Sequence, residues 1–231
     1  FSQPGTTALK DLGGMTNVLR SRRENVILAN SLNDRSGGYT KSEKHLDEMG
    51  KIFGKYIRLN EIVETQLQAD KKDILRREKT LGVHVRGTDF QRNYNGHPVS
   101  ISPEEYLQKA EEVFDSGKYE EIFLATDDLK ALKIFRKKFG NRLWCYPDTV
   151  RDDGVESVMN SASERENHHY LLGYEVLRDM YTLSSCSGLV AGLSQVSYAA
   201  RICKRSGGEK YIDEIILNKG INYHKRYNCP N

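Results

Sequence analysis

The segment LGVHVRGTDF, residues 81–90, passes from apolar side chains directly to three that could do chemistry. His84, Arg86 and Asp89 can bind charge or move protons, and they fall within six positions. Placing such groups at the end of a buried strand is costly unless they are paired or meet a ligand. Arg86 precedes Gly87, so its fork of donors is well suited to bidentate phosphate binding. The alternative is an ion pair with Asp89 that only holds the loop in place.

Two other apolar runs also end in polar residues. EEIFLATDD ends at Asp127 and Asp128, which could bind a metal, clamp a guanidinium or cap the helix that follows. Two adjacent acids without a third at ligand spacing are weak evidence for a divalent metal. SGLVAGLS ends at Ser194, and the turn Ser194-Gln195-Val196-Ser197 leads into a helical pattern whose N–H groups and dipole favour an anion.

The elements that would position these residues alternate along the chain. Continuous apolar runs predict strands, and patterns with apolar residues every three or four positions predict helices. The predicted strands are 80–85, 120–128, 142–147 and 187–194, and the predicted helices are 102–114, 129–140, 168–186 and 195–205. Strands of this kind, each followed by a helix, indicate an α/β fold with a parallel sheet. Because ligands bind at the carboxyl ends of such strands, the polar residues above should gather at one edge.

The first part of the chain is harder to interpret. NVILAN, residues 25–30, is the one strand pattern in residues 1–45. A helical pattern runs from Lys41 to about Arg77. The helix after residue 101 has a clear start, with Ser102 as its N-cap and Pro103 at its first position.

Composition excludes several classes. Lys and Arg number 35 and Asp and Glu 32, so the net charge of +3 gives no bulk electrostatic sign of nucleic-acid binding, and we expect no nucleic-acid partner. No apolar run approaches the ~20 residues of a membrane span. The scattered cysteines, without a CxxC pair, indicate free thiols in a reducing compartment, so we expect a protein of the cytoplasm or of the membrane periphery. His168 and His169 are adjacent, cannot share a metal on a helix, and are expected to face solvent.

Three segments carry a family resemblance. GVHVRGTD, FLATDD and DMYTLSSCSGLVAGLSQVSYAA match, in order and approximate spacing, the motifs of the α1,6/α1,2/protein-O-fucosyltransferase superfamily, over roughly residues 80–205. The chain resembles its bacterial, nodulation-fucosyltransferase-like branch. The resemblance implies a glycosyltransferase-B fold, in which the donor domain is Rossmann-like. It also implies an inverting transfer of fucose from GDP-fucose to a glycan or glycolipid hydroxyl, with no metal or other cofactor. It divides the chain into a remnant of the acceptor-side domain (1–45), a linking helical segment (46–78) and a GDP-sugar-binding domain (79–231).

The resemblance also implies roles for individual residues. Arg86 would hold the β-phosphate and promote departure of GDP, while Asp179 would accept hydrogen bonds from guanine N1–H and N2–H₂. Other sugar-donor contacts would come from His84, Asp127, Asp128, Ser194, Gln195, Val196 and Ser197. Catalytic roles would fall to Arg86 and to a general base on the loop 87–101, for which the candidates are Asp89 and His97.

The chain departs from the family pattern at three positions. Gly87 stands where many members have a second Arg, Gln195 replaces a frequent Ser, and Ser187 replaces a common acid. These differences leave the acceptor linkage open and allow a different nucleotide sugar as donor. An acceptor domain of ~100 residues is also expected, and residues 1–45 are too few for it. A nucleotide-sugar-binding domain without catalytic activity therefore remains an alternative.

Overall fold

The computed structural model of the 231-residue chain describes residues 43–75, 77–87, 97–152 and 165–222. Its centre is a five-stranded sheet in the order β3-β2-β1-β4-β5, in which all neighbouring strands run parallel. The strands are β1 (Thr80–Val85), β2 (Glu121–Thr126), β3 (Leu143–Trp144), β4 (Gly188–Gly192) and β5 (Glu214–Leu217). The helices are α2 (Glu43–Tyr56), α3 (Glu61–Ile74), α4 (Pro103–Phe114), α5 (Leu129–Phe139), α6 (His168–Ser185) and α7 (Gln195–Ser206), with a short 3-10 helix η4 (Gly140–Arg142) after α5. The α/β fold with a parallel sheet is thus confirmed.

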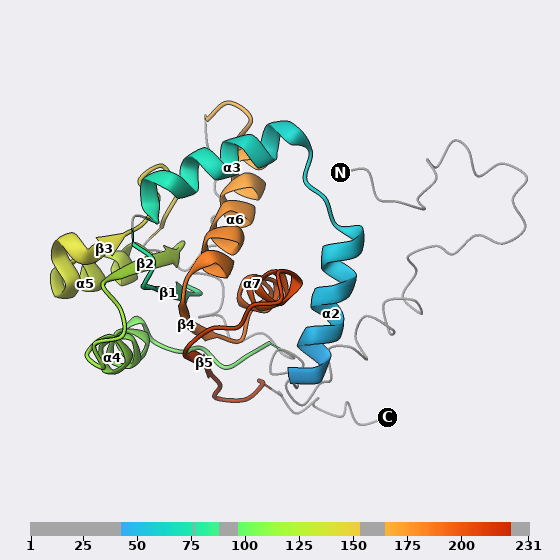
Figure 1. The fold of residues 1–231 in the computed structure, drawn as a ribbon. Coiled ribbons are helices and arrows are strands. Elements are labelled where there is room, and N and C mark those ends of the chain that lie inside the picture. Colours follow the sequence, from blue (N-terminus) through green and yellow to red (C-terminus); the bar gives the residue numbers. More distant parts are fainter. Residues whose placement is uncertain (1–42, 76, 88–96, 153–164, 223–231) are drawn as a thin grey trace, which may run out of the picture.

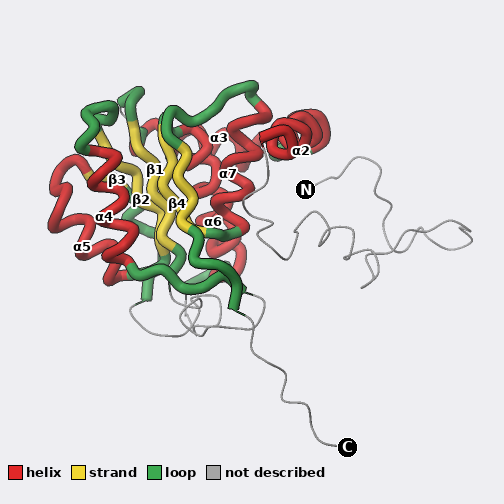
Figure 2. The backbone as a smooth tube through the Cα atoms, turned by 90° about the horizontal axis from the view of Figure 1, so that it is seen from below, coloured by secondary structure: helices red, strands yellow, loops and turns green. Residues whose placement is uncertain are grey.

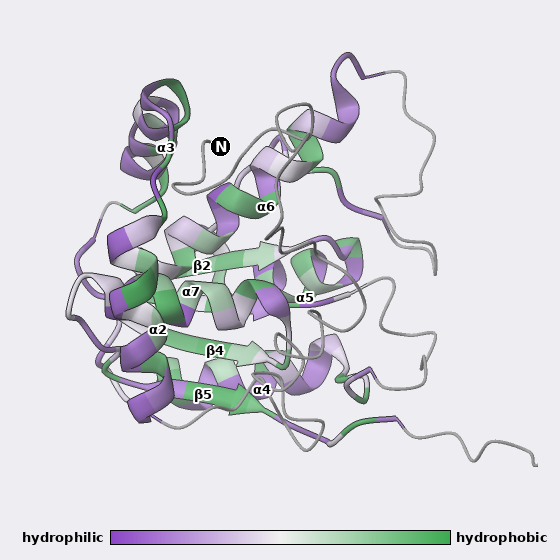
Figure 3. Cartoon of the chain, turned by 90° about the vertical axis from the view of Figure 1, so that its right-hand side faces the viewer, coloured by the Kyte–Doolittle hydropathy of each residue, from purple (hydrophilic) through white to green (hydrophobic). Residues whose placement is uncertain are grey.

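Helices cover both faces of the sheet (Figures 1 and 2). Helices α4 and α5 pack on one face, and α6 and α7 pack on the other, with α3 against α6 and α2 against α7. Apolar residues concentrate on the strands, while the outward sides of the helices are hydrophilic (Figure 3). Because both faces are buried, β1, β2 and β4 have no exposed position, which explains their continuous apolar runs.

The side chains of β1 alternate between the two cores. Leu81 and Val83 pack with α4 and α5, whereas Gly82 faces α6. A Cβ at Gly82 would lie 3.1 Å from both the Leu183 side chain and the Cys186 sulfur, so this glycine lets α6 approach the sheet closely. By the same alternation His84 falls on the face of α6 and α7.

Helix starts that the sequence predicts are confirmed. The Ser102 hydroxyl accepts a hydrogen bond from the Glu105 N–H at 3.3 Å, and the Glu105 carboxylate accepts one from the Ser102 N–H at 3.0 Å. Pro103 occupies the first turn of α4. The Asp128 carboxylate caps α5 by accepting from the N–H groups of Lys130 and Ala131 at 2.7 and 3.1 Å.

Other boundaries differ from expectation. The helical pattern from 41 to 77 divides into α2 and α3, because Asn60 caps a new helix by accepting from the Val63 N–H at 2.9 Å. The third strand is only Leu143–Trp144, which pair with Ile122 and Phe123 of β2. Strand β5, which pairs with β4, was not predicted from the sequence. The predicted strand at 25–30 lies outside the described residues.

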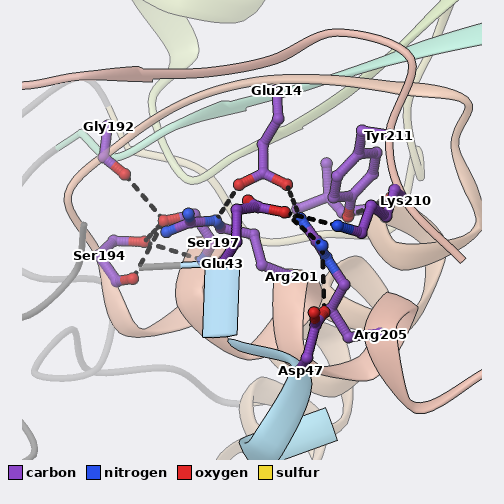
Figure 4. A network of polar contacts seen from close by, with 11 residues as sticks. Glu43, Asp47, Gly192, Ser194, Ser197, Arg201, Arg205, Lys210, Tyr211 and Glu214 are labelled. Atoms are coloured by element: carbon purple, nitrogen blue, oxygen red, sulfur yellow. Dashed lines mark hydrogen bonds and ion pairs between the residues drawn. The ribbon is translucent and has the colours of Figure 1, made fainter. Parts of the chain in front are cut away.

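A cluster of charges around the buried Arg205 joins α7 to α2 and β5 (Figure 4). The Arg205 guanidinium, with 4% of its side chain exposed, donates to Glu43 at 2.7 and 3.0 Å, to Asp47 at 3.2 Å and to Glu214 at 3.1 Å. Arg201 donates to Glu214 at 2.6 Å. A buried cation needs such partners, so these contacts fix the carboxyl-terminal half of α7, whose other end begins at the sheet edge.

Candidate functional site

The order of the strands identifies where a ligand should bind. Connections reverse direction between β1 and β4, and open parallel sheets bind ligands at such a switch point, beyond the carboxyl ends of the strands. Two of the sequence candidates meet there. His84 is in the fifth position of β1 and Ser194 follows β4, and the His84 Nδ1 and Ser194 Oγ atoms are 3.3 Å apart. The first and third motifs therefore touch across the switch point.

His84 is a neutral ligand-binding candidate. Its side chain is buried, and burial, with a smaller contribution from Arg86, lowers the pKa of the imidazole to about 3. The ring is therefore uncharged near neutral pH and can donate one hydrogen bond and accept another. Such a group can line a nucleotide pocket, but it is not suited to proton transfer near pH 7.

Ser194 and Ser197 orient the start of α7. The Ser194 hydroxyl accepts from the Ser197 N–H at 3.1 Å, and the Ser197 hydroxyl donates to the Gly192 carbonyl at 2.8 Å. These two hydroxyls are thus engaged within the turn. Helix α7 begins at Gln195, directly after Ser194, so its amino-terminal end lies at the switch point. The first turn of a helix presents N–H groups without intrahelical partners, and Gln195 and Val196 therefore form a positive end there.

Arg86 and Gly87 lie at the end of β1. Arg86 is half-buried, and both residues line a cavity of about 410 Å³ together with Ser102, Asp128 and Lys130. Gly87 has a steric role, because a Cβ there would lie 2.5 Å from the Asp128 Cβ. No side chain fits without movement at the position where many family members carry a second Arg.

The two acids after β2 have different tasks. The Asp127 carboxylate accepts from the Gly87 N–H at 3.1 Å, which ties the end of β2 to the residue after Arg86. The Asp128 carboxylate is buried and caps α5. The Asp127 carbonyl also accepts from the Asp152 N–H at 3.0 Å. Among the alternatives that the sequence left open for this pair, the cap is confirmed for Asp128.

Asp179 lies in α6 and is partly buried. Burial raises the pKa of its carboxyl to about 7. The acids Glu175 and Asp127 also raise this pKa, whereas the cations Arg178 and Arg151 lower it. Asp179 is therefore not a solvated acid on a helix surface. Arg151 was assigned no role from the sequence, because it follows the end of β3 by seven residues, whereas Arg86 directly follows β1.

The candidates for a general base are less defined. Asp89 lies outside the described residues. His97 is exposed, its carbonyl accepts from the Asn222 N–H at 2.8 Å, and the next residue, Pro98, lines a small cavity with Arg86. The segment that carries His97 thus lies at the same edge as Arg86.

Predictions made outside this edge have mixed outcomes. The expected exposure of the adjacent histidines is wrong for His168, which is buried while His169 is exposed, because neighbours on a helix point about 100° apart. Cys145, Cys186 and Cys203 are free thiols, as expected, and Cys229 lies outside the described residues. Within the described ranges, no three His, Cys, Asp or Glu side chains gather as metal ligands. No helix in those ranges has the length and apolar character that a membrane crossing requires.

Comparison with curated protein sequences and with protein-family profiles found no match. Comparison with solved structures found fucosyltransferase-like proteins. NodZ α-1,6-fucosyltransferase soaked with GDP-fucose is 18% identical, with a TM-score of 0.45 over 69% of this chain and 46% of that one. The fucosyltransferase NodZ from Bradyrhizobium is 16% identical, with a TM-score of 0.43 over 65% and 43%. POFUT1 in complex with GDP-fucose is 13% identical, with a TM-score of 0.45 over 76% and 51%. The chain therefore spans about half the length of the solved proteins that it resembles in part of its fold.

Proposed function

We propose that this chain contains the sugar-donor domain of an inverting, metal-independent glycosyltransferase that moves fucose from GDP-fucose to a glycan hydroxyl. The observation that carries the proposal is the contact between His84 and Ser194 across the switch point. It brings together the first and third motifs, and Asp127 brings the second motif to the same edge through its bond to Gly87. In this proposal the protein has a glycosyltransferase-B architecture, with residues 79–231 on the donor side and 1–45 on the acceptor side.

The proposed reaction is a displacement at C1 of the sugar. The acceptor hydroxyl oxygen forms a bond to C1 while the bond from C1 to the β-phosphate oxygen breaks, and its electron pair leaves with GDP. The acceptor proton passes to a base, for which Asp89 and His97 are the candidates. Arg86 and the amino-terminal end of α7 would neutralise the charge that develops on the leaving diphosphate. Preorganised donors of this kind contribute ~3–4 kcal/mol each to lowering the barrier.

Asp179 would select the base of the nucleotide. An ionised carboxylate accepts from N1–H and N2–H₂ of guanine, whereas uracil offers one N–H donor and adenine presents a different edge. The pKa of about 7 means that the empty site holds Asp179 partly protonated at neutral pH. Guanine binding would favour the ionised form, since both hydrogen bonds are made to that form.

Calorimetric titration with GDP, GDP-fucose, GDP-mannose and UDP, each with and without EDTA, tests the proposal. We expect the guanine nucleotides to bind more tightly than UDP, GDP-fucose to bind more tightly than GDP-mannose, and EDTA to change none of the affinities. Loss of GDP binding on chelation would contradict the metal-independent mechanism. Equal affinities for GDP and UDP would contradict the assignment of Asp179, and preference for GDP-mannose would identify a different sugar donor.

A further inference from the structure

A cavity of about 400 Å³ lies where α3 crosses α6 (Figure 1). Its volume falls in the ~300–1,000 Å³ range of small-ligand sites. Asn60 and Val63 line it from the start of α3, and Tyr170, Gly173 and Tyr174 line it from the first half of α6. Among the described residues, no Asp, Glu, Lys or Arg side chain lines this cavity. Its walls therefore suit an uncharged ligand.

Gly173 is a glycine that the packing of α6 does not require. A Cβ at this position would meet no atom within 4 Å, whereas a Cβ at Gly82 would lie 3.1 Å from the Leu183 side chain. Gly173 has no positive φ, so its backbone conformation does not require glycine either. Glycine inside a helix is less stable than alanine, but it allows a ligand to approach the backbone closely. This exception occurs at a residue that lines the cavity.

Two tyrosine side chains form the aromatic part of the lining. Tyr170 and Tyr174 are four residues apart in α6, so they lie on the same side of the helix. The Tyr174 hydroxyl donates to Asp70 of α3 at 2.8 Å, which fixes its ring between the two helices. Tyr170 is 60% exposed, which is unusual for a large aromatic side chain that no other element covers. Such ring faces can pack against the C–H faces of a sugar ring.

Polar groups without charge complete the lining. The Asn60 side-chain oxygen accepts from the Val63 N–H at 2.9 Å, and the nitrogen of the same amide can donate two hydrogen bonds. His169 contributes an imidazole to the cavity. His169 and Tyr170 also belong to the first turn of α6, whose N–H groups have no intrahelical partners. Sugar hydroxyls need uncharged donors and acceptors of this kind, whereas an acyl chain would leave them without partners.

We propose that this cavity binds an uncharged sugar residue of an oligosaccharide. The sugar ring packs on Tyr170 and Tyr174, its hydroxyls bond to Asn60 and His169, and Gly173 leaves room for it beside the helix backbone. This site goes beyond the proposed function, because the cavity shares no lining residue with the cavities beside Arg86. Binding of the oligosaccharide therefore requires no nucleotide.

Calorimetric titration without nucleotide tests the proposal. The probes are cellotetraose, maltotetraose and chitotetraose, which are uncharged and differ in linkage and substituents, and decanoate, which is an apolar chain without a sugar. We expect wild type to bind at least one tetrasaccharide with a Kd in the millimolar range or below, and not to bind decanoate.

Two substitutions locate the binding. In Gly173→Ala the new Cβ occupies the space for the ligand, so the affinity for the bound tetrasaccharide should fall at least ~10-fold. The same change should raise the melting temperature by about 2–4 °C, because alanine favours the helix. Tyr170→Ala should also lower the affinity at least ~10-fold, without unfolding the protein, since this side chain is exposed.

Val176→Ala is the matched control. Val176 is 52% exposed on the same helix and does not line the cavity, so its substitution should leave the tetrasaccharide affinity unchanged. All three variants should bind GDP as wild type does.

Failure of wild type to bind any of the three tetrasaccharides would overturn the proposal. Gly173→Ala and Tyr170→Ala proteins that bind the tetrasaccharide as wild type does would also overturn it. Binding of decanoate alone, weakened in both variants, would identify an apolar site instead. A wild type that binds a tetrasaccharide in this cavity but does not bind GDP would contradict the proposed function and leave the sugar site in place.

Discussion

Replacing Asp179 with Asn should have opposite effects on stability and on binding. The folded protein holds this carboxyl with a pKa of about 7, against an ordinary value of 3.8. The folded state therefore retains a proton that the unfolded chain releases, and its free energy of unfolding decreases as pH rises from about 4 to about 7. Above about pH 7 the ionised, buried carboxylate is a net cost to the fold. Asn has a similar shape and no charge, so it removes that cost.

The difference of about 3 pKa units corresponds to about 4 kcal/mol, at ~1.36 kcal/mol per unit. This figure is an upper limit for the gain in free energy of unfolding on Asp179→Asn in the ligand-free protein at about pH 8. At that pH the variant should melt up to roughly 10 °C higher than wild type. At about pH 4 the two proteins should melt at similar temperatures. The same change should cost about 1–3 kcal/mol of GDP affinity, since an amide donor would then face the N–H donors of guanine.

The assay is thermal unfolding of the ligand-free proteins from about pH 4 to about pH 8, followed by calorimetric titration with GDP. Asp213 provides a control whose pKa is shifted in the opposite direction, because hydrogen bonds from Tyr119 and Lys118 lower the pKa of its carboxyl. Asp213→Asn should destabilise the protein at about pH 8 and leave GDP affinity unchanged. An Asp179→Asn protein that is no more stable than wild type at about pH 8, or that binds GDP equally well, would refute the reasoning.

Two substitutions test the geometry of the switch point. Gly87→Ala should lower the melting temperature and weaken GDP binding, because a Cβ 2.5 Å from the Asp128 Cβ must displace the end of β1. An unchanged melting temperature and an unchanged calorimetric affinity for GDP would contradict the steric role of Gly87. Ser194→Ala removes the cap of α7, which is worth ~1 kcal/mol, and the hydroxyl beside His84. Ser194→Ala should lower the melting temperature by about 2–4 °C and reduce GDP affinity. A variant that is less stable but binds GDP as wild type does would show that Ser194 only caps α7.

Features set by local interactions could be predicted from the sequence. Ser102 and Asp128 precede helices and can bond to backbone N–H groups one turn away, so their capping roles do not depend on the rest of the fold. The strands β1, β2 and β4 are buried on both faces and are recognisable as apolar runs. The gathering of polar residues at one edge follows from the parallel order of those strands.

Features set by tertiary contacts could not be predicted. β5 is half-buried along its length and short, so it lacks the continuous apolar pattern. Which of His168 and His169 is buried depends on where α6 meets its neighbours. Asp179 was identified only through the family resemblance, because its raised pKa comes mainly from burial, with a contribution from Asp127, which is distant in the sequence.

Substitution of Arg86 by Lys tests the central claim, that this edge of the sheet catalyses departure of GDP from a sugar. Lys retains the charge and loses the bidentate geometry. Release of GDP from GDP-fucose should fall at least ~100-fold, while the melting temperature changes little. A stable Arg86→Lys protein that releases GDP at the wild-type rate would contradict the claim and leave the alternative of a nucleotide-sugar-binding domain without catalytic activity.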